Sequence, residues 1–277
     1  MGSLRDAMTG SGTARRGYPP PPMRTPLACM AAAAAVLALL APPASAQEIT
    51  RPLTCADAEL RCPDLRMRAP YDISTTKTRG GRTLLRAANA ILSVGRGPVV
   101  LLARRPRGSR TMRVRQRIYT TGGRYLTLPP LGRVVFKRIP GQGGYWKFEN
   151  AARFELWTMG RPEQRRLVRT GPKLVYCFRD LKRLRPSRRS PRSRVFPGCS
   201  QDRDRRSVRL GTSVGWADVY PAAYHENYVD VTGLRGCFAL WQIADPENHI
   251  AETDELNNAS RTVVRLRPGK QPRVGRC

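Results

Sequence analysis

The chain has 277 residues and a formal net charge of +30 at pH 7, with 50 lysines and arginines against 20 aspartates and glutamates. This length is enough for one sizeable hydrophobic core or two small ones. The charge draws the protein toward polyanions, but the basic residues are spread along the chain without a recognisable nucleic-acid-binding module, so we exclude a specific nucleic-acid reader.

The N-terminal part has the pattern of a secretory signal peptide. An apolar run over residues 25–41 follows several arginines, and Ala44 and Ala46 supply the small-residue cleavage pattern after it. The run is shorter than the roughly 20 residues that a membrane span needs. We therefore predict a signal peptide or leader over 1–46, a mature chain that begins at Gln47, and no transmembrane span in that mature chain.

Export places the mature chain, residues 47–277, outside the cell or in the cell wall. Translation starts at Met1 or Met23, which the sequence leaves open. The leader carries four arginines and one aspartate, a net charge of +3, so the mature chain keeps a charge of +27. Outside a cell, acidic wall polymers and other polyanions are the partners that suit such a charge.

After the leader, short stretches rich in Val, Ile, Tyr and Trp alternate with Gly, Pro and Arg. In chain order they are TLLRAANAILSVG, GPVVLL, QRIYTT, RYLTLPPLGRVVFKRI, FELWTM, KLVYCFRDL, VGWADVY, NYVDVTGL, GCFALWQIA and RTVVRL. Helical periodicity is scarce. The pattern is typical of an all-β fold, and we predict an antiparallel, disulfide-containing β-sandwich with few or no helices.

The tract from Lys182 to Gly198 interrupts this pattern with Pro, Ser and Arg. It contains little that a core could bury, so we predict a mobile basic loop on the surface. The simplest interpretation of the four tryptophans is that they are core or rim residues of the sheets. They are Trp146, Trp157, Trp216 and Trp241.

Six cysteines follow the leader, an even number that in an exported chain predicts up to three disulfides. They are Cys55, Cys62, Cys177, Cys199, Cys237 and Cys277. The pairs close in sequence are Cys55–Cys62, which would hold an N-terminal strand pair, and Cys177–Cys199. A zinc site is the competing interpretation, but the chain has no C-x-x-C pair.

A succession of motifs resembles the catalytic domain of lysyl oxidases in its shorter bacterial form. The motifs are CPDLRMRAPYDIS, YWKFENAARFELW, GPKLVYCFRD, GTSVGWADVYPAAYHENYVDVTGLRGCFAL and DPENHIAETDELNNAS. Their order and spacing extend over most of the mature chain. The resemblance implies copper-dependent oxidation of primary amines such as lysine side chains, with a lysine tyrosylquinone cofactor made from the protein's own residues.

The resemblance also assigns roles to three residues. Lys173 matches the lysine that joins the quinone, and Tyr220 matches the tyrosine that is oxidised to it. Asp218, two residues before Tyr220, would share its strand face and is a candidate proton acceptor. Without the resemblance, the ordinary interpretation is a surface lysine and a packed aromatic ring.

The family's copper ligands are histidines at alternate positions of a strand, which point to the same side. Here those positions fall at or near Gly143, Tyr145 and Lys147, none of which replaces an imidazole. The chain has only two histidines, His225 and His249, in separate segments. We therefore expect no copper-ligand set, and hence neither copper nor the quinone. An improvised site in which both imidazoles join Tyr145 or Asp218 is the weaker alternative.

Two functions remain open. The first is an exported lysyl-oxidase-like scaffold without turnover that binds anionic cell-wall polymers. The alternative is an active copper amine oxidase with an altered ligand set, acting on a lysine-containing protein. Residues 250–266 also resemble the closing hairpin of Ig-like surface modules, an interpretation that covers only the C-terminal third. Substrate and oligomeric state are not specified by the sequence.

Overall fold

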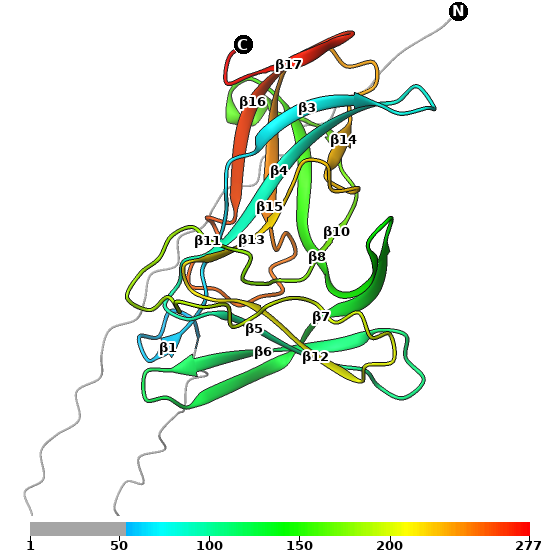
Figure 1. The fold of residues 1–277 in the computed structure, drawn as a ribbon. Coiled ribbons are helices and arrows are strands. Elements are labelled where there is room, and N and C mark those ends of the chain that lie inside the picture. The colour runs from blue at the N-terminus through cyan, green and yellow to red at the C-terminus, as the bar shows by residue number, and fades with distance from the viewer. Residues whose placement is uncertain (1–53) are drawn as a thin grey trace, which may run out of the picture. The chain divides into compact units, whose positions relative to one another are not determined.

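A computed structural model describes residues 54–277, so the predicted signal peptide and cleavage site lie outside the described residues. Within this range every strand pairing is antiparallel, and the one helical segment is the 3-10 turn Pro162–Gln164 (Figure 1). The all-β prediction is confirmed. No helix in this range is long and apolar enough to cross a membrane.

The large sheet has eleven strands. Its main path runs in the order β12-β5-β6-β7-β8-β15-β16-β17, while β1 pairs with β6, and both β9 and β10 pair with β8. The bounds are β1 (Leu60–Arg61), β5 (Val99–Arg104), β6 (Met112–Thr120), β7 (Tyr125–Ile139), β8 (Gly143–Thr158), β9 (Leu167–Thr170), β10 (Leu174–Tyr176), β12 (Ser207–Thr212), β15 (Gly236–Ala244), β16 (Ala259–Arg267) and β17 (Lys270–Val274).

The small sheet has six strands, ordered β11-β13-β4-β14, with β2 and β3 also paired to β4. Their bounds are β2 (Leu65–Met67), β3 (Tyr71–Lys77), β4 (Thr83–Ser93), β11 (Lys182–Arg183), β13 (Trp216–Tyr220) and β14 (Tyr228–Asp230). Figure 1 shows β5, β6 and β12 at the lower end of the molecule and β16 and β17 at the upper end.

Side chains from both sheets share one hydrophobic core. Leu85 and Ile91 of β4 belong to the same buried cluster as Phe148 and Phe154 of β8. Strand β4 is buried along nearly its whole length because it is the central strand of the small sheet. This packing is the β-sandwich that the alternating apolar stretches predicted.

Strand β8 contains Gly143, Tyr145 and Lys147, the positions at which copper ligands were expected by resemblance. Residues 143–148 pair with β7, and residues 152–158 pair with β15. Between these two halves Asn150 has a φ of 55°, a left-handed conformation that bends the strand. The bend lets the first half of β8 line a pocket while the second half continues the sheet.

Three disulfides connect the chain. Cys55–Cys62 and Cys177–Cys199 are the pairs predicted from closeness in sequence, and Cys237–Cys277 is the third. The expected N-terminal strand pair is wrong, because β1 pairs with β6 and β2 pairs with β4 instead. Each of these short strands is an edge addition to a longer strand, two residues of β1 on β6 and three residues of β2 on β4.

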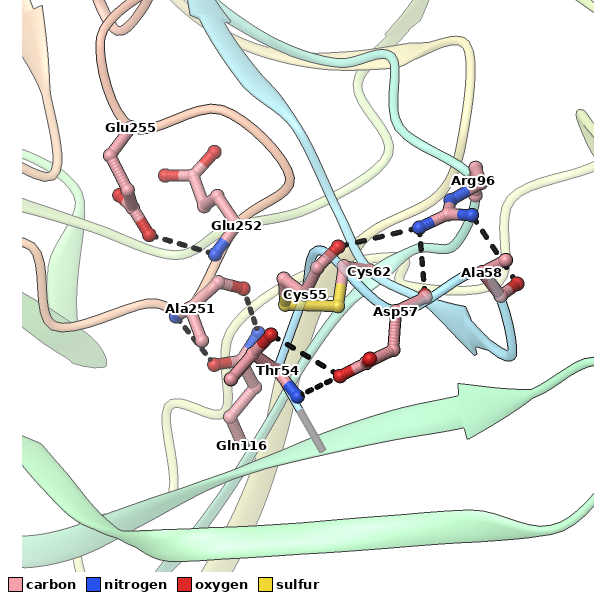
Figure 2. Close-up of a disulfide and its surroundings, with 10 residues drawn as sticks. All are labelled: Thr54, Cys55, Asp57, Ala58, Cys62, Arg96, Gln116, Ala251, Glu252 and Glu255. Carbon is pink, nitrogen blue, oxygen red and sulfur yellow. Dashed lines mark hydrogen bonds between the residues drawn. A yellow bond between two sulfur atoms is a disulfide. The ribbon is translucent and has the colours of Figure 1, made fainter. Parts of the chain in front are cut away.

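The surroundings of Cys55–Cys62 show how the N-terminal segment is fixed (Figure 2). The guanidinium of Arg96 donates hydrogen bonds to three carbonyl oxygens, those of Cys55, Asp57 and Ala58. Gln116 is fully buried and exchanges two hydrogen bonds, of 2.9 and 2.8 Å, with the backbone of Ala251. The disulfide thus lies beside a contact between β6 and the segment before β16.

The tract from Lys182 to Gly198 lies on the surface, as predicted, but it is attached at several points. Phe196 is buried, which contradicts the expectation that the tract has little to bury. The Trp216 indole donates to the Pro191 carbonyl, and Leu184 donates to the carbonyl of Gly215. A single buried aromatic and a few backbone hydrogen bonds are enough to fix a tract whose composition indicates mobility.

Candidate functional site

A cavity of about 400 Å³ opens between the first half of β8 and the end of β13; we call it the lysine pocket. Its polar and aromatic lining consists of Gln142, Tyr145, Lys147, Arg179, Tyr220, Tyr224 and His225. These residues come from segments that are far apart in sequence, so the pocket exists only in the folded chain.

The turn after β13 carries two of these side chains. Pro221 follows the last residue of β13 and lacks the N–H that would continue the ladder, so the strand ends there. The Pro221 carbonyl then accepts hydrogen bonds from the Tyr224 amide and from the Asn227 side chain. This closed turn directs Tyr224 and His225 toward the lysine pocket.

Lys147 is the central cation of the pocket. Its side chain is buried, with the residue 4% exposed, and Nζ lies 2.9 Å from the Tyr224 hydroxyl oxygen. The same nitrogen lies 5.1 Å from the ring centroid of Tyr220 and 4.9 Å from that of Tyr224. No carboxylate of residues 54–277 pairs with it within 4.0 Å, so aromatic faces and one hydroxyl are its nearest partners.

Three tyrosines pack together beside Lys147; we call them the tyrosine cluster (Tyr176, Tyr220 and Tyr224). The rings of Tyr176 and Tyr220 are stacked, with centroids 3.8 Å apart and planes 13° apart. Burial, followed by the negative charge of Asp218, raises the pKa of Tyr220 well above its ordinary value. Its hydroxyl accepts a hydrogen bond from the Cys177 amide, which fixes the phenol in place and lowers the pKa of Tyr220 in part.

Asp218 is fully buried behind the pocket. Burial raises its pKa to about 6, although the cations of Arg179 and Lys147 lower it in part. Arg179 Nε lies 3.5 Å from Asp218 Oδ1, longer than a good ion-pair hydrogen bond. Asp218 and Tyr220 point to one side of β13, whereas Ala217 and Val219 belong to a separate small cluster.

The charges around Lys147 oppose one another. Burial is the main reason that its pKa falls from 10.5 to about 8; Asp218 and Glu226 raise it, and Arg179 and Lys137 lower it. Glu226 is already paired with Lys137 at 2.7 Å, which weakens its effect on Lys147. Near neutral pH the uncharged fraction of Lys147 is therefore larger than that of an ordinary lysine, although the protonated form still predominates.

The structure brings together some of the predicted site residues and separates others. Tyr220 and Asp218 lie beside Lys147. Lys173, by contrast, is exposed and does not line the pocket, so the lysine whose amine lies against Tyr220 is Lys147. Tyr145 lines the pocket and donates its hydroxyl hydrogen to the Gln142 carbonyl, whereas Gly143 is exposed.

The two histidines lie in different places. His225 lines the lysine pocket, and burial lowers its pKa, with Glu226 opposing that shift. His249 lines another cavity, next to Phe148 and Glu247. The improvised site with both imidazoles is therefore wrong, because the pocket holds one of them only.

The residues at the expected ligand positions do not fit copper. Gly143 offers no side-chain donor, the Tyr145 hydroxyl donates to a carbonyl, and Lys147 has a buried amine in place of the expected imidazole. Protonated Lys147 would repel a metal cation, and three imidazoles are the donors that such a strand needs. Among residues 54–277 no group of three or more His, Cys, Asp and Glu side chains is positioned to hold a metal ion.

Several residues of the lysine pocket and the tyrosine cluster were not singled out from the sequence. Arg179 follows β10, Tyr224 lies in a turn, and Tyr176 lies on β10 between two apolar residues. One local feature marks the site: Phe178, next to Arg179, has a φ of 49°, a strained conformation for a bulky residue. Such strain is visible only in three dimensions.

A second, larger cavity of about 1060 Å³ lies against β5, β6 and β12; we call it the arginine cleft. Six arginines line it, and no acidic residue is among its described lining residues. They are Arg104, Arg105, Arg113, Arg115, Arg205 and Arg209.

The sheet register places four of these arginines on one face. Arg104 lies directly opposite Arg113, and Leu102 lies between Arg115 on one side and Arg209 on the other. All four are exposed, and no carboxylate of the described chain lies within 4.0 Å of them. Like charges directly opposite each other destabilise a sheet, so this arrangement favours an anionic ligand.

No family model and no curated protein matches the sequence. The two cavities are therefore the features of the described chain that point to a function.

Proposed function

We propose that the protein is an exported lysyl-oxidase-like scaffold that works as a binding module for anionic polymers of the cell wall, without copper-dependent turnover. The observation that carries this proposal is the arginine cleft. The motif order supports the scaffold, three disulfides support an extracellular location, and the donor set at Gly143, Tyr145 and Lys147 supports the loss of the metal.

Arginine suits repeated anionic groups because its planar guanidinium binds phosphate or carboxylate with two parallel hydrogen bonds. In the cleft, Arg104 and Arg113 form one row across the strands, and Arg115 and Arg209 form the next. Phe196 lies 4.9 Å from the Arg209 guanidinium and holds it at the wall of the cleft. A polymer that carries an anion at every repeat can contact several of these groups at once.

Inorganic polyphosphate is a suitable probe. In a variant with Arg104, Arg113, Arg115 and Arg209 all changed to Gln, we expect the affinity to fall by about 10- to 100-fold at physiological salt, since several charge-assisted contacts are lost. The matched control changes four exposed arginines outside the cleft, Arg235, Arg265, Arg273 and Arg276, so that both variants lose the same charge.

If both variants lost affinity equally, net charge alone would explain binding and the cleft would have no role. Hyaluronan, tested in parallel, separates a preference for phosphate from one for carboxylate. The cleft variant should melt no lower than the wild type, because opposed like charges are removed from the sheet.

An active copper amine oxidase with an altered ligand set is the second candidate. The observation that favours it is the position of Lys147, whose amine lies 5.1 Å from the Tyr220 ring centroid. Peptide mass spectrometry of the secreted chain tests it, together with copper uptake and the absorption band of a quinone. A Tyr220 fused to Lys147 or Lys173 would establish this function; unmodified Tyr220 in copper-treated protein would exclude it.

A further inference from the structure

We propose that the lysine pocket binds a small carbonyl compound that carries a carboxylate, with Lys147 forming an imine to the carbonyl carbon and Arg179 pairing with the carboxylate. This site is separate from the arginine cleft and does not depend on the polymer-binding function.

The pocket provides a nucleophile. Lys147 lines the cavity, and its Nζ has no paired carboxylate among the described residues and lies 5.1 and 4.9 Å from the ring centroids of Tyr220 and Tyr224. Desolvation of this kind activates a lysine amine, and the lowered pKa of Lys147, about 8, agrees with it. A purely structural lysine would more commonly be paired with a carboxylate in such a place.

The pocket also provides an anchor for an anion. Arg179 lines the same cavity, and its side chain is 33% exposed. Within residues 54–277 its one polar partner is Asp218, at 3.5 Å from Nε, and Nε itself makes no hydrogen bond. The terminal nitrogens of the guanidinium are thus able to take a ligand carboxylate in a forked pair.

The cavity of about 400 Å³ is of a size for a small ligand rather than a polymer. Because one wall is cationic and another is aromatic, a short acid with an aldehyde or keto group fits both. An uncharged aldehyde would use Lys147 alone.

The reaction balances without an oxidant or reductant. The uncharged amine of Lys147 attacks the carbonyl carbon, a C–N bond forms, and the C=O π electrons move to oxygen, which takes a proton. The carbinolamine then loses this oxygen as water, and the nitrogen's lone pair forms the C=N bond. The Tyr224 hydroxyl, 2.9 Å from Nζ, is placed to hand a proton to the departing oxygen and recover one from the nitrogen.

The test is reductive trapping with glyoxylate, an aldehyde that carries a carboxylate. Borohydride converts the imine into a stable carboxymethyl-lysine, and peptide mapping reports which lysine reacted. The chain has only six lysines, Lys77, Lys137, Lys147, Lys173, Lys182 and Lys270. At pH 7.5 and low glyoxylate, we expect labelling of Lys147 to exceed that of exposed Lys173 by about 10-fold, since more of it is uncharged.

Two variants test the assigned roles. Arg179→Gln should slow labelling of Lys147 by glyoxylate about 10-fold but leave labelling by uncharged propanal unchanged, since only the former uses a carboxylate contact. Lys147→Arg should abolish the preferred adduct, and the matched Lys173→Arg should preserve it. Circular dichroism checks that each variant folds.

The wild-type peptide map decides the matter even where a variant fails to fold. Labelling confined to the exposed lysines, with Lys147 unmodified, would overturn the imine. Equal slowing of both aldehydes by Arg179→Gln would overturn the carboxylate contact.

Discussion

Lys147 donates a 2.9 Å hydrogen bond from Nζ to the hydroxyl oxygen of Tyr224 in a buried pocket where no carboxylate of the described chain pairs with it. Burying a cation with so little compensation costs stability. The fold therefore carries a destabilising residue at the bottom of a cavity, as sites kept for ligand binding often do.

This cost predicts a pH dependence of folding. The pKa of Lys147 falls from 10.5 to about 8 on folding, so between these values the unfolded chain binds more protons and stability rises with pH. The penalty at neutral pH is on the order of 3 kcal/mol. In Lys147→Met the rise between pH 8 and 10.5 should be smaller than in the wild type, measured by urea unfolding. Exposed Lys173→Met should keep it; an identical pH profile in the Lys147 variant would contradict the assignment.

Asp180 fixes both ends of the basic tract. Its buried carboxylate accepts hydrogen bonds from the amides of Val195 and Phe196 and from the amide and hydroxyl of Ser213. Asp180→Asn should destabilise the protein by about 2–3 kcal/mol, because an amide cannot accept all four. Trypsin should then cleave the tract from Lys182 to Gly198 faster. Asp204→Asn, at an exposed position, is the control, and equal cleavage of the two variants would show that Asp180 does not hold the tract.

Glu252 should respond to pH in the opposite direction. Burial, opposed by hydrogen bonds from the Leu65 amide and the Asn258 side chain, raises its pKa from 4.5 to about 9. The folded chain then binds more protons than the unfolded chain between these values, so stability falls as pH rises. Glu252→Gln should reduce this fall, because the glutamine side chain does not titrate. The variant should still fold, since the Asn258 side-chain amide can rotate so that its oxygen accepts a hydrogen bond from the glutamine NH2.

The measurement compares urea unfolding at pH 5 and pH 9. EDTA is present to remove metal ions, so that only protons bind the carboxylates. Glu255→Gln is the control, because Glu255 accepts one hydrogen bond, from the Glu252 amide, and is less buried. A fall in stability in Glu252→Gln as large as that in the wild type would contradict a protonated Glu252.

The disulfides should differ in their effect on stability. The paired cysteines are 7, 22 and 40 residues apart for Cys55–Cys62, Cys177–Cys199 and Cys237–Cys277. Because a longer closed loop removes more entropy from the unfolded chain, replacing the third pair by serines should cost most, about 4 kcal/mol, and the first pair least. Thermal unfolding of the three double variants gives the order, and the reverse order would show that folded-state contacts dominate.

Local pattern in the sequence was enough for several features. The apolar stretches from β4 to β16 and the two pairs of nearby cysteines are properties of short segments, and each is confirmed. Asp218 and Tyr220 lie on the same face of their strand, because side chains two residues apart in a strand point to the same side. The short strand β12 (Ser207–Thr212) was not predicted, because its alternation of Val208 and Leu210 with polar residues covers four positions only and ends at Gly211.

Tertiary structure alone decided which segments meet. A period of two fixes the face on which a side chain lies but not the strand that pairs with it, and the partner depends on sheet register over long separations. For that reason the sequence could not show that Lys147 rather than Lys173 lies against Tyr220, or that arginines from three strands form one cleft. Composition determined the charge of this protein, and strand pairing determined where that charge is concentrated.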